Sequence, residues 1–406
     1  MSKHPFTIRK GMPHVYIDGF LKDLENRGYK KKTQKHYKVD IRRFTAYARS
    51  NGIHTVRQFV ARAHALVRGY PGSQSARFGI QASVNRFIEY LIRNDIAQRP
   101  GHKPRSRYEQ LAYEFTQFQL EHRGICSAYA KATRRFSNIF LDYLQQRGIR
   151  RLRSVTSETV LDFITEQSKG YKRKTVSCRC TILRALLAYL YRRGLIRVDF
   201  SSVVIGPRIY QDEACPRFMS KAQIRALLSQ IDRTTIAGMR DYAMIILLAT
   251  YGLRGIEVIR LRLEDIDWRK NLICIRGRKA RNNTVYPLTS AVAQALVQYL
   301  KEARPAVNAR HVFVAVKAPY RPLVDPCPLS VKIQKYVKSA GIKVDHPGTH
   351  TFRYSCAQML LEQGSPLKVI SDYLGHMRPE TTRQYLKIAI EDLREVACGD
   401  GEEVVL

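Results

Sequence analysis

The sequence predicts a mainly α-helical protein with a small β-sheet, arranged as two all-helical modules followed by a larger α+β domain. Three observations indicate this: helical patterns that recur in the first half, two proline-containing segments typical of linkers, and a pair of short strand-like runs in the second half. The 406 residues are enough for two or three domains, and a hydrophobic content of 45% excludes a mainly disordered chain.

The first half of the chain repeats itself at a spacing of 96 residues, which is the separation of Phe44 from Phe140. The recurring residues are Arg27-Gly28 and Arg123-Gly124, Lys35 and Lys131, Phe44 and Phe140, Tyr47 and Tyr143, Gly52-Ile53 and Gly148-Ile149, with Tyr90-Leu91 and Tyr189-Leu190 matching at an offset of 99. The apolar helical faces are Val39, Ile41, Phe44, Tyr47 and Ala48 in the first copy and Phe136, Ile139, Phe140, Tyr143 and Leu144 in the second. Chance similarity is the alternative, but five matched sites at one offset favour a duplication.

Two segments mark the expected borders of the modules. Residues 98–107 contain Pro100, Gly101 and Pro104, and residues 206–220 contain Pro207 and Pro216. The resulting division places one module at 1–101, a second at 102–209 and the larger domain at 210–406.

The larger domain is expected to begin with helices and to contain one strand pair. Ser220 has the residue type and position of a helix N-cap. The strands are expected at 271–276 and 284–288, joined by a basic turn at 277–283. Mostly helices follow, one of them expected at 355–363. Gly252 and Gly375 are expected to end helices.

The charge indicates a polyanionic partner, because 70 Lys and Arg against 34 Asp and Glu give a net charge of +36. Nucleic acid is the first candidate, since neutralising phosphates releases counterions. An anionic membrane is the second, but no lipidation signal, basic amphipathic helix or long apolar run supports it. The first ten residues are polar and basic, which predicts a cytoplasmic, nucleoid-associated protein.

The candidate DNA contacts are clustered basic residues, although each run alone could be a solvated surface. They are Lys30, Lys31, Lys32, Arg42, Arg43, Arg134, Arg135, Lys172, Arg173 and Lys174 in the modules, and Arg278 and Arg281 in the turn of the strand pair. The eight cysteines form neither a CxxC pair nor a zinc pattern, so we expect reduced core thiols and no metal site.

Four short clusters in the last domain carry candidate chemistry. They are Arg254 with Glu257, Lys279, His350 with Arg353, and His376 followed by Tyr385. Each cluster alone has an ordinary interpretation: a helical ion pair, a solvated turn lysine, a common spacing, and a packed histidine and tyrosine. The ordered set is far more specific than its parts.

This set resembles the tyrosine recombinase or phage-integrase family over residues 218–390. Thr250 to Glu257 resembles the family's T-G-L-R-x-x-E box, and Lys279 lies eight residues before Pro287, as the family's hairpin lysine does. The sequence departs from the family at Tyr251, Phe352 and Tyr354. Both modules resemble the family's single core-binding domain, so the first copy is an addition that contacts extra DNA or a partner subunit.

The resemblance implies that the partner is double-stranded DNA and that the mechanism needs no metal or cofactor. Tyr385 attacks the phosphodiester and forms a 3′-phosphotyrosyl bond. Arg254 and Arg353 hold the non-bridging oxygens, and Lys279 protonates the leaving oxygen. Three further residues complete the site: His350 shuttles a proton, His376 bonds the phosphoryl group, and Glu257 orients Arg254.

Several functions share these residues. The first is a site-specific recombinase that integrates or transposes a mobile element, which the duplicated module favours. The alternatives are a host Xer-like chromosome resolvase, a type IB-like topoisomerase and a catalytically silent DNA-binding accessory protein. The family's synaptic complex implies a homotetramer that is monomeric when free, with partner recombinases as a further option. Residues 388–396 have the pattern of a short helix that docks on a neighbouring subunit or on its own domain.

Overall fold

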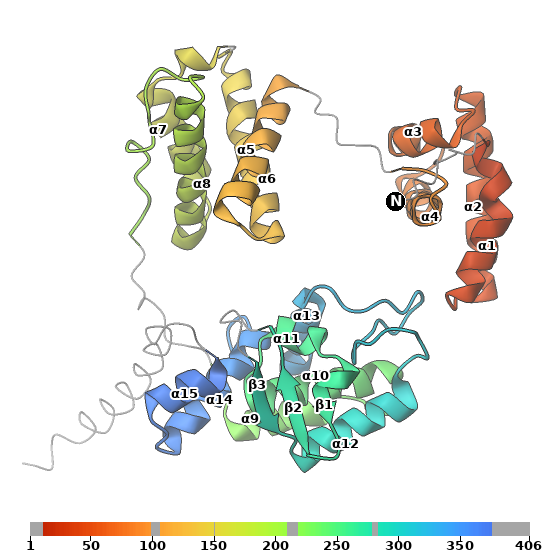
Figure 1. The fold of residues 1–406 in the computed structure, drawn as a ribbon, viewed down its shortest axis with the longest axis vertical. Coiled ribbons are helices and arrows are strands. Elements are labelled where there is room, and N and C mark those ends of the chain that lie inside the picture. The colour runs from red at the N-terminus through yellow and green to blue at the C-terminus, as the bar shows by residue number, and fades with distance from the viewer. Residues whose placement is uncertain (1–10, 99–105, 150, 209–217, 278–282, 376–406) are drawn as a thin grey trace, which may run out of the picture. The chain divides into compact units, whose positions relative to one another are not determined.

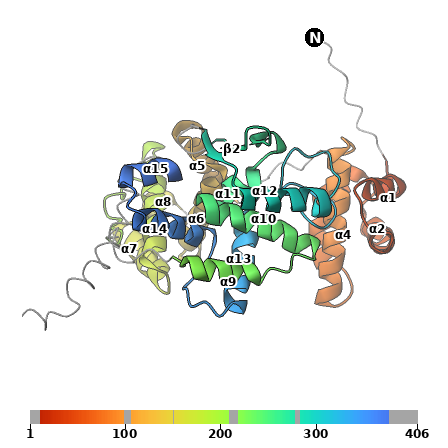
Figure 2. The ribbon, with the colours of Figure 1, turned by 90° about the horizontal axis from the view of Figure 1, so that it is seen from below.

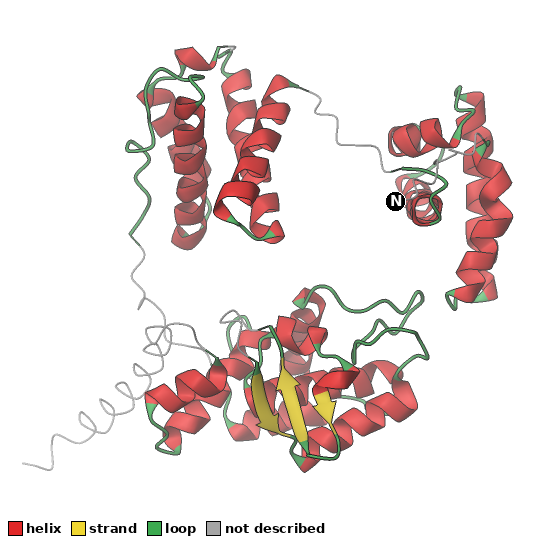
Figure 3. Cartoon of the chain, in the orientation of Figure 1, coloured by secondary structure: helices red, strands yellow, loops and turns green. Residues whose placement is uncertain are grey.

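The computed structural model describes residues 11–98, 106–149, 151–208, 218–277 and 283–375, and its described part is helical apart from one small sheet (Figure 3). The chain divides into two compact units, one formed by Met1–Arg99 with Ala214–Leu406 and the other by Pro100–Glu213. The three-part division at residues 101 and 209 stays a prediction.

Each helical module contains four α-helices in the same order (Figure 1), although the short 3₁₀ turn comes before the first helix in one module and between the second and third in the other. The first contains η1 (Pro13–Tyr16), α1 (Ile17–Asn26), α2 (Lys31–Ser50), α3 (Val56–Arg68) and α4 (Gln74–Arg93), and the second contains α5 (Arg107–Arg123), α6 (Ser127–Gln146), η2 (Leu152–Ser154), α7 (Ser157–Ser168) and α8 (Arg173–Arg192). Helices α2 and α6 have 20 residues each, as do α4 and α8. The equal lengths at the repeat spacing support the duplication.

The repeated apolar and aromatic residues lie in the two cores or pack against them. Phe44 packs against Phe59 at a ring distance of 5.8 Å, and Phe140 packs against Phe163 at 4.9 Å. Most residues of the predicted helical faces are buried, Tyr47 and Ile139 are partly buried, and Val39 is 40% exposed. Val39 lies two residues before Ile41 and therefore points about 200° away from it around the helix.

The C-terminal domain is built around one long buried helix. Its elements are α9 (Lys221–Ser229), α10 (Ile236–Tyr251), α11 (Gly255–Arg260), η3 (Leu263–Asp265), β1 (Ile266–Asp267), β2 (Leu272–Ile275), β3 (Thr284–Pro287), α12 (Ser290–Gln298), the π-helical turn η4 (Tyr299–Ala303), α13 (Cys327–Ser339), α14 (Thr349–Glu362) and α15 (Leu367–Leu374). Helix α10 packs against α9, α11, α12 and α14 and runs between α12 and α9 in Figure 2.

The sheet is antiparallel with the order β1-β2-β3, and Ile273 pairs with Tyr286. The two predicted strands form with slightly narrower bounds, and the sequence pattern missed β1 because it has only two residues. Ser220 caps α9 as predicted, because its side chain accepts a hydrogen bond from the Gln223 backbone N–H. Helix α14 begins at Thr349 rather than at the expected Ser355, so the His350–Arg353 motif lies inside its first turns.

Candidate active site

Arg254 is placed by a sharp helix end. Gly252 follows α10 at φ +58°, a left-handed conformation that favours glycine and confirms the predicted end of the helix. A Cβ at Gly252 would also meet Leu374 Cδ2 at 2.7 Å, so no side chain fits there. The chain then turns into α11 with Arg254 at its N-cap.

Glu257 holds Arg254 by two contacts. Its Oε1 accepts a hydrogen bond from Arg254 Nη1 at 2.9 Å, and its Oε2 accepts one from the Arg254 backbone N–H at 2.8 Å. The Glu257 side chain is only 7% exposed and that of Arg254 is 21% exposed. The pair is therefore better shielded from water than an ordinary surface ion pair, and it fixes the direction of the guanidinium.

Arg353 reaches the same place from α14. It is 3% exposed, and its Nη1 donates to the Gly252 carbonyl at 2.9 Å. Its Nη2 donates to the Leu374 carbonyl at 2.5 Å, while Arg254 Nη2 donates to the Gly375 carbonyl at 3.4 Å. Both guanidinium groups thus meet at the C-terminal end of α15.

His350 lies in the first turn of α14, three residues before Arg353. Desolvation lowers the pKa of His350, the positive charges of Arg353 and Arg254 lower it further, and Glu257 opposes them. The neutral form, which has one nitrogen free to accept a proton, is therefore favoured at neutral pH.

The thiol of Cys356 lies close to this arrangement but does not compete with it. A Cβ added at Gly252 would meet Cys356 Cβ at 3.1 Å, which places the thiol beside the helix end. Burial raises the pKa of the Cys356 thiol to about 11, so it stays protonated at neutral pH. A protonated, buried thiol is a poor nucleophile.

The structure brings together Arg254, Glu257, His350 and Arg353 from the predicted site. Lys279, His376, Tyr385, Arg278 and Arg281 lie outside the described residues. The described residues nearest to them belong to the strand pair and to the end of α15. Strand β2 ends at Ile275 and strand β3 begins at Thr284. Gly375 ends α15 at φ +65°, as the sequence predicted.

Most of the predicted DNA contacts in the modules are exposed. The exposed residues are Lys30, Lys31, Lys32, Arg42, Arg43, Arg135, Lys172, Arg173 and Lys174. Arg134 is instead half-buried, 3.9 Å from Glu109, with its guanidinium over the Tyr113 ring. Arg42 lines a groove of about 680 Å³ together with His14, Arg49 and His54.

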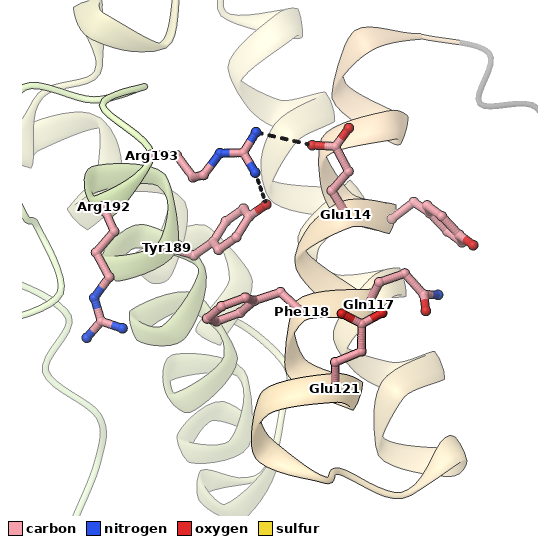
Figure 4. A pocket seen from close by; sticks show the side chains of 8 residues that line it. Glu114, Gln117, Phe118, Glu121, Tyr189, Arg192 and Arg193 are labelled. Carbon is pink, nitrogen blue, oxygen red and sulfur yellow. Dashed lines mark hydrogen bonds and ion pairs between the residues drawn. The ribbon is translucent and has the colours of Figure 1, made fainter.

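The second module has a groove of a different character (Figure 4). It has a volume of about 440 Å³ and is lined by Glu114, Glu121, Phe118 and Tyr189, with Arg193 placed 3.9 Å from Glu114. Arg192 and Arg193 line the same groove, so its wall carries both signs of charge.

Sequence reasoning missed a buried charge network in the C-terminal domain. Asp241 on α10 is fully buried and accepts hydrogen bonds from Arg240, from Lys332 and, at 3.1 Å, from the Tyr336 hydroxyl. Burial, followed by the Asp241 charge, raises the pKa of Tyr336 to about 12. These contacts fasten α13 to α10. The adjacent Arg240-Asp241 pair inside an apolar helix was the available signal.

Within the described residues, no group of three or more His, Cys, Asp or Glu side chains is arranged to hold a metal ion. The six described cysteines, Cys126, Cys178, Cys180, Cys274, Cys327 and Cys356, are free thiols. No helix in the described part of the chain is both long and apolar enough to cross a membrane.

Known proteins resemble this chain over nearly its whole length. The family model described as "Phage integrase family" matches residues 217–391. The protein named "Putative integrase/recombinase y4rA" of Sinorhizobium fredii is 31% identical over 96% of this chain and 94% of its own length. A second S. fredii protein, "Putative integrase/recombinase y4gC", is 42% identical over 47% of this chain and 98% of its own length.

The fold is shared with a solved structure. The XerH site-specific recombinase, crystallised with its palindromic difH substrate in a post-cleavage complex, superposes with a TM-score of 0.58. The match has 17% identity and covers 70% of this chain and 84% of the other. Together with the full-length relative, these comparisons show that the chain belongs to the tyrosine recombinase (phage integrase) family, whose enzymes break and rejoin DNA.

Proposed function

We propose that this enzyme recombines DNA at specific sites for a mobile element, through a 3′-phosphotyrosyl intermediate formed by Tyr385. One observation carries the proposal: Arg254 and Arg353, 99 positions apart, meet at one end of α15 with His350 beside them. Two guanidinium groups at one point form a site for a phosphodiester, because each can give paired hydrogen bonds to anionic oxygens.

The arginines would stabilise the charge that develops in the transition state. A pentacoordinate phosphorus carries more negative charge on its non-bridging oxygens than the starting diester. Glu257 keeps Arg254 oriented for this task, so little reorganisation is needed when the phosphate arrives.

Two proton transfers remain. A free tyrosine has a pKa of about 10, so Tyr385 must lose its proton on attack, and neutral His350 is available to accept it. Lys279, on the turn of the strand pair, would protonate the departing 5′-oxygen, and His376 would bond the phosphoryl group. The protein–DNA bond conserves the energy of the cleaved diester, so rejoining needs no nucleotide.

The helical modules would hold the DNA on the side opposite the C-terminal domain, as a C-shaped clamp. Lys30 and Lys172 stand at the N-caps of α2 and α8, and each is followed by two more cations in the first turn. Cations at the positive end of a helix dipole destabilise the helix by roughly 0.3–1 kcal/mol each. Residues that oppose local stability in this way support a contact with phosphates.

Two features already described favour a mobile-element role. They are the duplicated module and the similarity to integrase/recombinase proteins. S. fredii also has "Putative integrase/recombinase y4rF", 27% identical over 96% of this chain. Two full-length relatives in one organism support the existence of partner recombinases. Four protomers would form the synapse, and residues 388–396 would dock on a neighbouring subunit.

A nicked synthetic substrate carrying the element's ends tests the chemistry. The wild-type protein should form a covalent protein–DNA band, and Tyr385→Phe should bind the same DNA without forming it. Tyr354→Phe is the matched control and should keep the band. A covalent band with Tyr385→Phe would overturn the assignment of the nucleophile.

The clamp has its own test. A fragment that begins at Pro207 should bind the substrate at least a hundredfold more weakly, and full-length binding should fall steeply with salt. Equal affinity of fragment and full chain would contradict the clamp. Relaxation of supercoiled DNA without strand exchange would instead point to a topoisomerase.

A further inference from the structure

Three consecutive backbone carbonyls at the end of α15 each accept a hydrogen bond from a side chain of another element. The Tyr373 carbonyl accepts from the Tyr286 hydroxyl, the Leu374 carbonyl from Arg353 and the Gly375 carbonyl from Arg254. The last carbonyls of a helix have no intrahelical donors, so they are available for such contacts. Two of the three donors are the arginines of the proposed site, and the third is Tyr286 on β3.

Tyr286 is held rigidly. It is 2% exposed, and its ring lies 5.1 Å from the Tyr251 ring and 5.0 Å from the Tyr373 ring. Its strand is paired with β2 through Ile273. A hydroxyl carried on a packed ring and a paired strand has little freedom, so it fixes the position of the carbonyl that it bonds.

We propose that Tyr286 is a positioning residue for the two arginines, which it controls by fixing the end of α15. Holding the Tyr373 carbonyl keeps the next two carbonyls in place, and these orient the guanidinium groups of Arg353 and Arg254. A guanidinium has five N–H donors, so it can be oriented along one edge and still give donors to a phosphate. This proposal rests on the proposed function, in which these arginines bind the scissile phosphate.

Tyr286 also belongs to the strand that leads out of the turn carrying Lys279. A change at Tyr286 could therefore slow cleavage in two ways, by misplacing the arginines or by misplacing the general acid Lys279. A substrate with sulfur in place of the bridging 5′-oxygen separates them, because a thiolate leaves without protonation. A defect that acts through Lys279 disappears on this substrate, and one that acts through the arginines persists.

The variant is Tyr286→Phe, which removes the hydroxyl and keeps the ring. Its matched control is Tyr251→Phe, whose hydroxyl belongs to the same aromatic cluster but donates to the Pro287 carbonyl at 2.7 Å instead of to α15. Single-turnover cleavage of a nicked substrate is measured with saturating enzyme, together with DNA affinity and thermal midpoint. We expect cleavage by Tyr286→Phe to slow about tenfold at unchanged DNA affinity, and Tyr251→Phe to stay within about twofold of wild type.

A double-mutant cycle identifies the route. In an Arg254→Lys background, Tyr286→Phe should slow cleavage by clearly less than the tenfold that it causes alone, because one of the two arginines that it positions is already lost. The tenfold defect of the single variant should persist on the sulfur substrate. Equal slowing by Tyr286→Phe and Tyr251→Phe, a fully additive cycle, or a defect that vanishes with the sulfur leaving group would each overturn the proposal. If wild type itself forms no covalent band, the proposed function fails instead.

Discussion

In the first helical module the run Lys30–Lys32 begins α2, whereas the equivalent positions 126–128 of the second module hold Cys-Ser-Ala. The reverse holds at the last helices: Lys172–Lys174 begins α8, and positions 73–75 before and within α4 hold Ser-Gln-Ser. The buried repeat positions are kept while the basic runs have changed helices. Packing and the placement of the basic runs are therefore independent properties of these modules, and we expect the two copies to contact DNA with different helices.

The largest expected effect tests what the two modules share, which is the packing of their buried repeat positions. Phe44→Ala and Phe140→Ala remove fully buried, equivalent rings, and each should destabilise its module by about 3–5 kcal/mol. Hydrogen exchange of the backbone amides in α2 and α6 measures the two modules separately. Strong loss of protection in one module but not in the other would show that the copies are not packed alike.

The next largest effect tests what differs between the two modules, which is the position of the basic runs. Replacing Lys30, Lys31 and Lys32 by Gln should weaken DNA binding about tenfold and lower the slope of log affinity against log salt by roughly two to three. The same replacement of Lys172, Arg173 and Lys174 should do likewise. Fluorescence anisotropy at several salt concentrations measures both. The isolated Lys22→Gln on α1 is the control, and two unchanged slopes would contradict phosphate contact by the runs.

A smaller effect concerns the turns that the modules share. Gly52 and Gly148 have φ of +76° and +73°, and nothing lies within 4 Å of where a Cβ would stand. Alanine at either position should cost about 1 kcal/mol of stability through the backbone alone. Gly79→Ala inside α4, which has equal space and no positive φ, should not destabilise. Thermal unfolding compares the three variants.

The smallest expected effect concerns the C-terminal domain rather than the modules. There His350 lies beside two arginines. Because the pKa of folded His350 is lowered, the unfolded chain binds a proton more readily below about pH 6.5. His350 therefore contributes stability above that pH, and the contribution falls as the pH drops. His350→Asn should reduce the difference between the thermal midpoints at pH 7 and pH 5. An unchanged difference would contradict the shifted pKa.

Much of the fold was predictable because local rules decide it. Gly252 and Gly375 end helices where the sequence suggested, and Ser220 begins one. The start of α14 was missed because Gly348 offers no capping side chain ahead of Thr349. The exposed position of Val39 depends on which helix face meets its neighbours, which a count of apolar residues does not show.

The sequence named candidate residues for the site but did not indicate their geometry. The motif order named Arg254 and Arg353, but nothing in the order indicates that both donate to α15 carbonyls. Tyr286 was missed for the same reason, since its partner is a backbone atom 87 positions away. Contacts with main-chain atoms leave no side-chain signature in a sequence.

The carbonyls at the end of α15 have a consequence for which anions the enzyme accepts. In the DNA-free protein the Leu374 and Gly375 carbonyls each already take a donor from an arginine, so only the remaining donors are left for a phosphate. A free phosphate ion held by these remaining donors alone would gain little. In the proposed clamp, a phosphate within a duplex held by the basic modules would arrive at high effective concentration, which compensates for the donors already in use. Tethering, rather than the intrinsic affinity of the arginines, then sets the preference for DNA over free phosphate.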